Sequence, residues 1–182
     1  GAIIGIESYR DKNIADVQKR DDVYNVRATV RELIKNGRRA LGTFMVGFPD
    51  DSIEDMEYDI TQLADEGLFA CQLTLLTPFH GTKLWKQMEH LVTETDLSKF
   101  DLYNLVWNHA KMSPSEARDL MAWAQRKVND PDVVAQKIKQ DMKDKLRREM
   151  AAKRGVLPVG SRPSRLGLGG GMAAGAFAAP NV

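Results

Sequence analysis

Three short apolar segments alternate with two helical patterns along the first half of the chain. The apolar segments cover residues 2–6, 40–48 and 69–76, and turn residues follow each of them. Continuous rather than alternating apolar character is typical of strands buried on both faces of a parallel sheet. The helical patterns cover about residues 22–36 and 52–67, between the apolar segments. This order predicts parallel strands joined by helical crossovers, which is an α/β fold.

The second half of the chain is predicted to be helical. A short helix is expected at about residues 83–90. The clearest start signal is Ser113-Pro114-Ser115-Glu116, because Ser can cap a helix, Pro suits the first helical position and Glu can close a capping box. That helix should end near Val128, before Asn129-Asp130-Pro131. A last helix is expected over about residues 132–153, where an apolar residue recurs at every fourth position.

The composition limits the functions that are open to the chain. Its 182 residues include 26 Lys and Arg and 25 Asp and Glu, so the net charge is +1 and nucleic acid is not expected as a partner. The single cysteine, Cys71, excludes an internal disulfide and any cluster held only by cysteines of this chain. The sequence has neither the ~20 continuous apolar residues of a membrane span nor a signal-peptide pattern, so we expect a cytoplasmic protein.

Both ends of the sequence are unusual for a complete domain. Gly1 leads directly into an apolar segment, and a natural domain rarely begins inside a buried strand, so we expect a piece of a longer protein. At the other end, residues 167–180 are nearly all Gly, Ala and Leu without periodicity. Such a segment cannot bury enough side chain to offset its ordering entropy, which predicts a disordered tail over residues 155–182.

Polar and turn residues follow all three predicted strands. They are Glu7-Ser8 after the first strand, residues 47–52 after the second and residues 77–82 after the third. Each segment alone fits an ordinary loop or the start of a helix. Because parallel strands present their carboxyl ends at one edge, where α/β proteins bind ligands, the three together predict a functional site there.

These segments resemble three motifs of the radical S-adenosylmethionine (SAM) enzymes. Residues 5–8 resemble G-[IV]-E-S, residues 44–52 are similar to F-I-V-G-F-P-G-[ED]-T, and residues 75–82 are similar to L-x-T-P-[FY]-P-G-T. Residues 96–101 and 111–116 look like the region after the barrel in the subgroup that often carries an N-terminal cobalamin-binding domain. The resemblance covers about residues 3–125, and its second and third motifs are the most specific.

The resemblance implies a partial (β/α)6, TIM-like barrel of which this chain holds the last three strand–helix units. On that basis, residues 1–92 would be the C-terminal half of the barrel and residues 93–154 a helical C-terminal extension, followed by the Gly/Ala-rich tail of residues 155–182. The missing N-terminal half of the same protein would then be a partner of this chain.

The resemblance also implies cofactors and a class of reaction. Radical SAM enzymes bind a 4Fe–4S cluster through CxxxCxxC after the first barrel strand, and the cluster reduces SAM to methionine and a 5′-deoxyadenosyl radical. This sequence lacks that motif, so the cysteines are expected upstream and Cys71 is expected to be a small core residue. Cobalamin would bind in an upstream domain. The radical would act on a small-molecule or lipid-like substrate, in methylation, cyclisation or related C–H chemistry.

The motifs carry a set of SAM-binding residues over to this sequence. Glu7 and Ser8 would contact the ribose or the amino acid end of SAM. The turn Gly47-Phe48-Pro49 and the strand end Leu76-Thr77-Pro78 would border the adenine with backbone groups and apolar faces. A glycine at position 47 would let the ligand approach the backbone. His80, at the same edge, would contact the substrate.

The sequence departs from these motifs at three places. Asp50 stands where the family usually has Gly, and His80 stands where it usually has Pro. Tyr9-Arg10 follows Glu7-Ser8, where Gly-Ser is common. A turn with positive φ at position 50 would suit Asp better than most residues but less well than Gly. The departures concern the local geometry around SAM rather than the fold.

Two other classes of function stay open. The last helix carries a cluster of basic residues, which indicates either a solvated face or a docking surface for a partner or for nucleic acid. A non-catalytic α/β scaffold that docks a partner through this helix is therefore the alternative. Another α/β-barrel enzyme, such as an aldolase or isomerase, would need a catalytic Lys or a general base with an oxyanion donor, and no such set stands at a strand end. The basic residues are Lys137, Lys139, Lys143, Lys145, Arg147, Arg148, Lys153 and Arg154.

Overall fold

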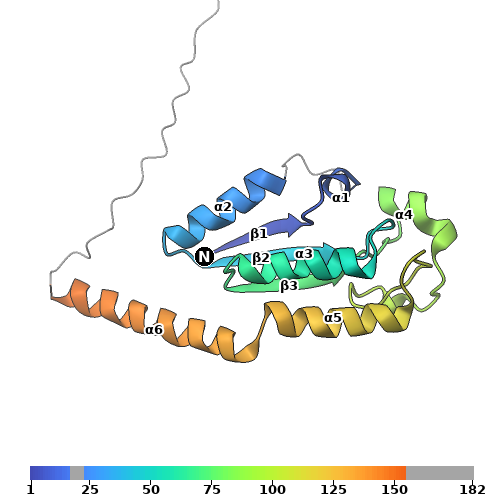
Figure 1. Cartoon of the computed structure of the whole chain (residues 1–182). Helices are drawn as coiled ribbons and strands as arrows, with labels where there is room; N and C mark the ends of the chain where they lie inside the picture. Colours follow the sequence, from blue (N-terminus) through green and yellow to red (C-terminus); the bar gives the residue numbers. More distant parts are fainter. Residues whose placement is uncertain (17–22, 155–182) are drawn as a thin grey trace, which may run out of the picture. The chain divides into compact units, whose positions relative to one another are not determined.

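A sheet of three parallel strands forms the centre of the computed structural model, which describes residues 1–16 and 23–154. The strands are β1 (Ala2–Glu7), β2 (Ala40–Val46) and β3 (Ala70–Leu75), in that order across the sheet. Figure 1 shows the three arrows side by side, all pointing to the same end of the sheet. The predicted α/β class and parallel pairing are confirmed, and the arrangement is compatible with part of a barrel or of an open sheet.

The helices lie close to their predicted positions, with one addition. The additional helix is α1, whose six residues are too few to show a periodic apolar pattern. Two short 3-10 turns, Glu89–Leu91 and Leu97–Lys99, also occur. The helices are α1 (Asp11–Asp16), α2 (Val23–Lys35), α3 (Ile53–Asp65), α4 (Lys83–Met88), α5 (Pro114–Val128) and α6 (Pro131–Lys153).

Both predicted capping boxes are present. At the start of α3, Ser52 Oγ accepts a hydrogen bond from the Asp55 N–H over 3.2 Å, and Asp55 Oδ2 accepts one from the Ser52 N–H over 3.0 Å. At the start of α5, Ser113 and Glu116 make the same reciprocal pair. Each box satisfies N–H groups that a helix start leaves without a partner, so the sequence fixes where both helices begin.

The helices cover one face of the sheet. Buried side chains such as Ile6, Phe44 and Leu73 point to that face and pack against the apolar sides of α2, α3 and α5. On the opposite face, Ile3 and its register partner Leu41 are 76% and 36% exposed. Among the described residues, burial on both faces is therefore not observed, and the sheet presents an apolar face that no described element covers fully.

The chain divides into two compact units, Gly1–Gln140 and Asp141–Val182. Within the second unit, Arg147 and Asp144 form an ion pair over 3.7 Å on the described end of α6. The domain boundaries expected after residues 92 and 154 stay predictions, and the predicted disordered tail lies outside the described residues. Of the helices that the structure describes, none combines the length and the apolar character needed to cross a lipid bilayer.

Candidate functional site

The three predicted site segments meet at the carboxyl edge of the sheet. Val46 pairs with Leu75, and Glu7 pairs with Phe44, so the three strands end at nearly the same level. The segments that follow them, residues 7–10, 47–52 and 76–80, are called the rim segments below. The structure thus brings together the residues that the sequence predicts for SAM, although their contact with SAM stays a prediction.

Glu7 ends β1 in a strained conformation. The register shifts between Gly5 and Glu7, which marks a bulge, and Glu7 adopts a φ of 64°. A non-glycine residue with positive φ costs about 1–3 kcal/mol and persists only where its surroundings hold it. Bulges redirect side chains and recur next to active sites. Among the predicted site residues, Glu7 therefore has the strongest local sign of function.

Ser8 belongs to a buried polar network. Its side chain is buried, and its Oγ accepts hydrogen bonds from the Arg10 N–H over 3.2 Å and from Asn13 Nδ2 over 3.1 Å. Asn13 also donates to Asp51 Oδ2 over 2.8 Å. Ser8 thus links the segment after β1 to α1 and to the turn after β2, a role that the sequence did not indicate.

Arg10 joins the segment after β1 to the turn after β2 and to α3 through ion pairs. Its Nε lies 2.9 Å from Asp59 Oδ2 and 3.9 Å from Asp51 Oδ1, and its Nη2 lies 3.2 Å from Asp55 Oδ1. Burial raises the pKa values of Asp51 and Asp59, and the nearby guanidinium of Arg10 works against this rise. The departure from Gly-Ser at positions 9 and 10 therefore has a structural role.

Tyr9, the other residue of that departure, packs inside the fold. Its ring meets Phe44 edge to face at 5.3 Å, and the Arg27 guanidinium lies 4.6 Å from the ring centre. The Tyr9 hydroxyl is buried, and it has no hydrogen-bond partner among the residues that the structure describes. Burial raises the pKa of this phenol strongly, so it stays protonated and is no candidate for a catalytic base.

The turn that follows β2 is by itself a reason for glycine at position 47. Its φ is 80°, in the left-handed region that glycine adopts without steric cost. A Cβ at this position would stand 3.4 Å from Leu75 Cδ2 and 3.6 Å from Met112 Cε, in ordinary contact with the chain's own side chains. Asp50 is not among the described non-glycine residues with positive φ, so the replacement of the family's glycine there causes no strain.

The side chains of the other predicted adenine-contact residues are mostly buried. Phe48 and Leu76 belong to a second small core with Met88 and Trp107, and Pro78 is buried as well. Thr77 Oγ1 donates to the carbonyl of Leu75 over 3.0 Å. The apolar faces of these residues are therefore used in packing, whereas Pro49 is half-buried. The expected contact of these segments with adenine stays a prediction.

Two residues that sequence reasoning did not select hold both of these segments. The Trp107 indole donates from Nε1 to the carbonyl of Leu76 over 2.9 Å, and the His109 ring bonds through Nε2 to the carbonyl of Phe48 over 2.8 Å. Both side chains are buried, at 2% and 5% exposure. A buried aromatic pair with polar edges is a weak signal in a sequence, because such residues usually belong to a core.

His80 lies at the rim as predicted and is exposed. Its ring stacks on Trp85 with a centroid separation of 3.6 Å, and Phe100 lies 5.9 Å away. The three rings form an aromatic group beside the carboxyl end of β3. The expected contact between His80 and a substrate stays a prediction.

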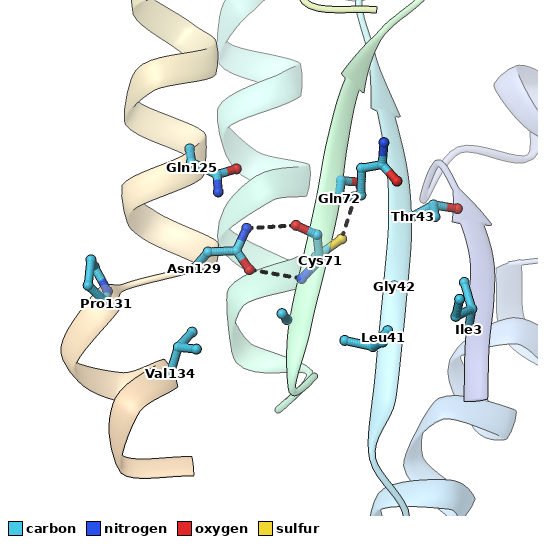
Figure 2. Close-up of a pocket in the computed structure, with 11 residues that line it drawn as sticks. Ile3, Leu41, Gly42, Thr43, Cys71, Gln72, Gln125, Asn129, Pro131 and Val134 are labelled. Carbon is cyan, nitrogen blue, oxygen red and sulfur yellow. Dashed lines mark hydrogen bonds between the residues drawn. The ribbon is translucent and has the colours of Figure 1, made fainter. Parts of the chain in front are cut away.

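A groove of about 520 Å³ lies at the other end of the sheet (Figure 2). Apolar side chains from the beginnings of the strands, including Ile3 and Leu41, line it together with residues around the α5–α6 junction. The amide of Asn129, which also lines it, is already paired with the backbone of Cys71. The described residues that line the groove include no carboxylate, histidine or lysine, so the candidate for chemistry remains the rim.

The described part of the chain shows no group of side chains that could bind a metal ion. No three His, Cys, Asp or Glu side chains there are grouped to hold a metal ion. Cys71 is buried inside β3, and burial raises the pKa of its thiol to about 12. A thiol of this kind is a poor metal ligand, because thiolates and not thiols bind metals.

Comparison with known proteins points to methyltransferases. The chain is 27% identical over 126 residues to bacteriochlorophyllide d C-12(1)-methyltransferase of Chlorobaculum tepidum, a match that covers 69% of this chain and 28% of that protein. It is 39% identical over 57 residues to an uncharacterized methyltransferase of Pyrococcus horikoshii, covering 31% and 12% respectively. No family profile matches the chain. The chain thus spans less than a third of either relative, and both relatives are named as methyltransferases.

Proposed function

We propose that this chain is the C-terminal part of the catalytic barrel of a radical SAM enzyme and that its rim segments form part of the SAM site. The observation that carries the proposal is the meeting of three motif-bearing segments, far apart in sequence, at the carboxyl edge of one parallel sheet. Ligands bind at this edge in (β/α) enzymes. Similarity to two methyltransferases supports SAM as the ligand, because SAM is the common methyl donor.

In this proposal the rim residues divide the recognition of SAM between them. Glu7 would accept hydrogen bonds from the ribose hydroxyls or the ammonium group of SAM, as a carboxylate fixed in a strained turn. Ser8 and Arg10 would hold the segment after β1 in place through their buried network. The backbone of residues 47–49 and 76–78 would border the adenine. His80 would face the substrate.

The 4Fe–4S cluster is not assigned to this chain. The described residues include one cysteine, and Cys71 is buried within a strand with a raised pKa, so this part of the protein does not fit a cluster. We place the cluster ligands, in a CxxxCxxC motif, in an N-terminal half that would also cover the exposed sheet face at Ile3 and Leu41. A cobalamin-binding domain would likewise lie upstream.

The proposed chemistry belongs to the complete protein. Bound SAM would supply a 5′-deoxyadenosyl radical or a methyl group for methylation, cyclisation or related C–H chemistry on a small-molecule or lipid-like substrate. The contribution of this chain would be to bind and orient SAM and to exclude water from one side of the barrel.

The test is anaerobic reconstitution of the full-length protein with iron and sulfide. Release of 5′-deoxyadenosine from SAM in the presence of a reductant is the expected result. A variant with the upstream cysteines replaced by Ala is the control and should release none. The proposal is wrong if the upstream reading frame lacks CxxxCxxC, or if the reconstituted protein neither binds nor cleaves SAM.

A second candidate is a non-catalytic scaffold that docks a partner through α6. The observation in its favour is that Ile138, Met142, Leu146 and Met150, one helical turn apart, are all exposed on a helix rich in Lys and Arg. If this reading is right, the upstream sequence should lack the cysteine triplet. Truncation of the full-length protein after Asp130 should then abolish partner binding, whereas under the enzyme proposal SAM binding should survive it.

A further inference from the structure

Two carbonyl groups of the rim segments are held by side chains that come from outside the rim. The carbonyl of Leu76 belongs to the first residue after β3, and that of Phe48 lies in the turn after β2. Trp107 donates to the first and His109 contacts the second. The two rings lie beside each other with centroids 5.0 Å apart. One short segment of chain therefore fixes the positions of both rim segments.

The protonation pattern of His109 follows from its neighbours. The Lys111 N–H donates to His109 Nδ1 over 3.1 Å, so Nδ1 carries the lone pair. Nε2 then carries the proton and donates it to the carbonyl of Phe48 over 2.8 Å. Lys111 adds a third contact between this segment and the rim, because its Nζ donates a hydrogen bond to the carbonyl of Asp50. The imidazole thus makes a hydrogen bond at each nitrogen, and rotation of the ring would break both of them.

The segment that carries these side chains is itself anchored. Val92 and Trp107 form an isolated antiparallel bridge, the Thr93 N–H donates to the carbonyl of Val106 over 3.0 Å, and the Asn108 N–H donates to the carbonyl of Leu91 over 2.8 Å. Short backbone pairing of this kind gives the indole and imidazole a rigid base. Rigid support for a binding segment lowers the ordering entropy that ligand binding would otherwise cost.

We infer that Trp107 and His109 are positioning residues for the SAM site: by holding the carbonyls of Leu76 and Phe48, they set the two rim segments that would border the adenine. The inference rests on the proposed function. Their effect is on the shape of the site before SAM arrives, and neither residue is assigned a contact with SAM. Loss of either hydrogen bond should loosen these rim segments and weaken SAM binding.

The test compares Trp107→Phe and His109→Leu with matched controls in the full-length protein. Trp123→Phe makes the same change on α5, and His90→Leu makes it at an exposed position on the turn after α4. His109→Gln restores a donor near the position of Nε2. Hydrogen exchange of the peptides covering residues 47–52 and 76–80 is measured without SAM, and the dissociation constant of SAM is measured by equilibrium dialysis.

We expect Trp107→Phe and His109→Leu to speed exchange in both peptides and to weaken SAM binding about tenfold, which is 1.4 kcal/mol. His109→Gln should recover most of the affinity, and the controls should change neither quantity. Unchanged exchange in the rim peptides overturns the inference, and so does faster exchange with unchanged SAM affinity. A wild-type protein that binds no SAM overturns the proposed function instead, while exchange alone still decides whether the two residues hold the rim segments.

Discussion

The side-chain amide of Asn129 pairs with both backbone polar groups of Cys71. Asn129 Oδ1 accepts from the Cys71 N–H over 2.8 Å, and Asn129 Nδ2 donates to the Cys71 carbonyl over 2.6 Å. The amide therefore takes the place that a neighbouring strand would have on the outer edge of β3 (Figure 2). Farther along the same edge, the Leu75 N–H donates to the carbonyl of Leu102 over 2.7 Å. Strand edges left open favour aggregation, and this edge is closed at both ends.

Replacement of Asn129 should open this edge. Asn129→Ala leaves the N–H and carbonyl of Cys71 without their partners, and an unsatisfied buried backbone group costs about 1–3 kcal/mol. We expect the free energy of unfolding to fall by about 2–3 kcal/mol and the Cys71 amide to exchange faster. Urea unfolding and hydrogen exchange of the purified protein measure both. Asn108→Ala, at an exposed position, is the control, and an equal loss of stability in the two variants would contradict the strand-like role.

The Tyr9 hydroxyl should be dispensable for stability. It is buried and has no hydrogen-bond partner in the described part of the chain, and a buried polar group in that state destabilises the fold. Tyr9→Phe keeps the edge-to-face contact with Phe44 and removes the hydroxyl. We expect the variant to be more stable by about 1 kcal/mol in thermal unfolding. A loss of stability would show that the hydroxyl has a partner, such as an ordered water.

Burial of Asp51 should make stability depend on pH in a definite direction. Because burial raises its pKa above the ordinary value of 3.8, the folded protein binds this proton more tightly than the unfolded chain does. The stability contribution of this group is therefore fully present below that ordinary value and is lost as pH rises through the raised pKa. Asp59 shifts in the same direction for the same cause.

Asp51→Asn removes this titration and keeps an oxygen acceptor for Asn13. The stability of the variant relative to the wild type should therefore improve as pH rises from about 4 to 7. Urea unfolding at a series of pH values measures the difference. Asp119→Asn, at an exposed position on α5, is the control for a charge change alone. A difference that stays constant with pH would contradict the burial argument.

The order of strands and helices was predictable because each element carries its own local signal. Apolar runs bounded by turns predicted β1 to β3, and the capping boxes at Ser52 and Ser113 set the starts of α3 and α5. The polar rim followed from parallel topology alone. By contrast, Trp107 lies 31 residues from the carbonyl that it binds and His109 lies 61 residues from its own, so no local pattern reports these contacts.

The network around Arg10 was missed for a related reason. In the sequence, Tyr9-Arg10 stands out only as a departure from a motif, and no local pattern marks Asp51 as a partner of Arg10. Their partnership depends on the turn after β2 folding back over the segment after β1. Tertiary contact, and not spacing along the chain, decides which carboxylates are buried and which are solvated.

The thiol of Cys71 should be unreactive in the folded protein. Burial raises its pKa to about 12, so the thiolate that reacts with alkylating agents is almost absent at pH 8. We expect iodoacetamide to modify this cysteine at least about a hundredfold more slowly in the folded than in the urea-unfolded protein. Mass spectrometry of the peptide that contains Cys71 measures both rates and separates it from other cysteines of a longer protein. Similar rates would contradict its assignment to the core.

Glu7 offers a way to separate backbone strain from ligand binding. Its φ of 64° is costly for Glu and free of cost for Gly, so Glu7→Gly should hold or raise the melting temperature. If the carboxylate binds SAM, the same variant should bind SAM about ten- to a hundredfold more weakly, since a charge-assisted hydrogen bond is worth about 1.5–3 kcal/mol. Glu7→Gln and Glu7→Ala keep the strain and should lose similar affinity.

The three variants distinguish two roles for Glu7. Equilibrium dialysis with SAM and thermal unfolding, both on the full-length protein, supply the measurements. If Glu7 only shapes the bulge, Glu7→Gly should bind SAM as the wild type does, because glycine adopts the same turn without strain. Unchanged affinity in Glu7→Gln at normal stability would lead to the same conclusion and would remove Glu7 from the SAM site.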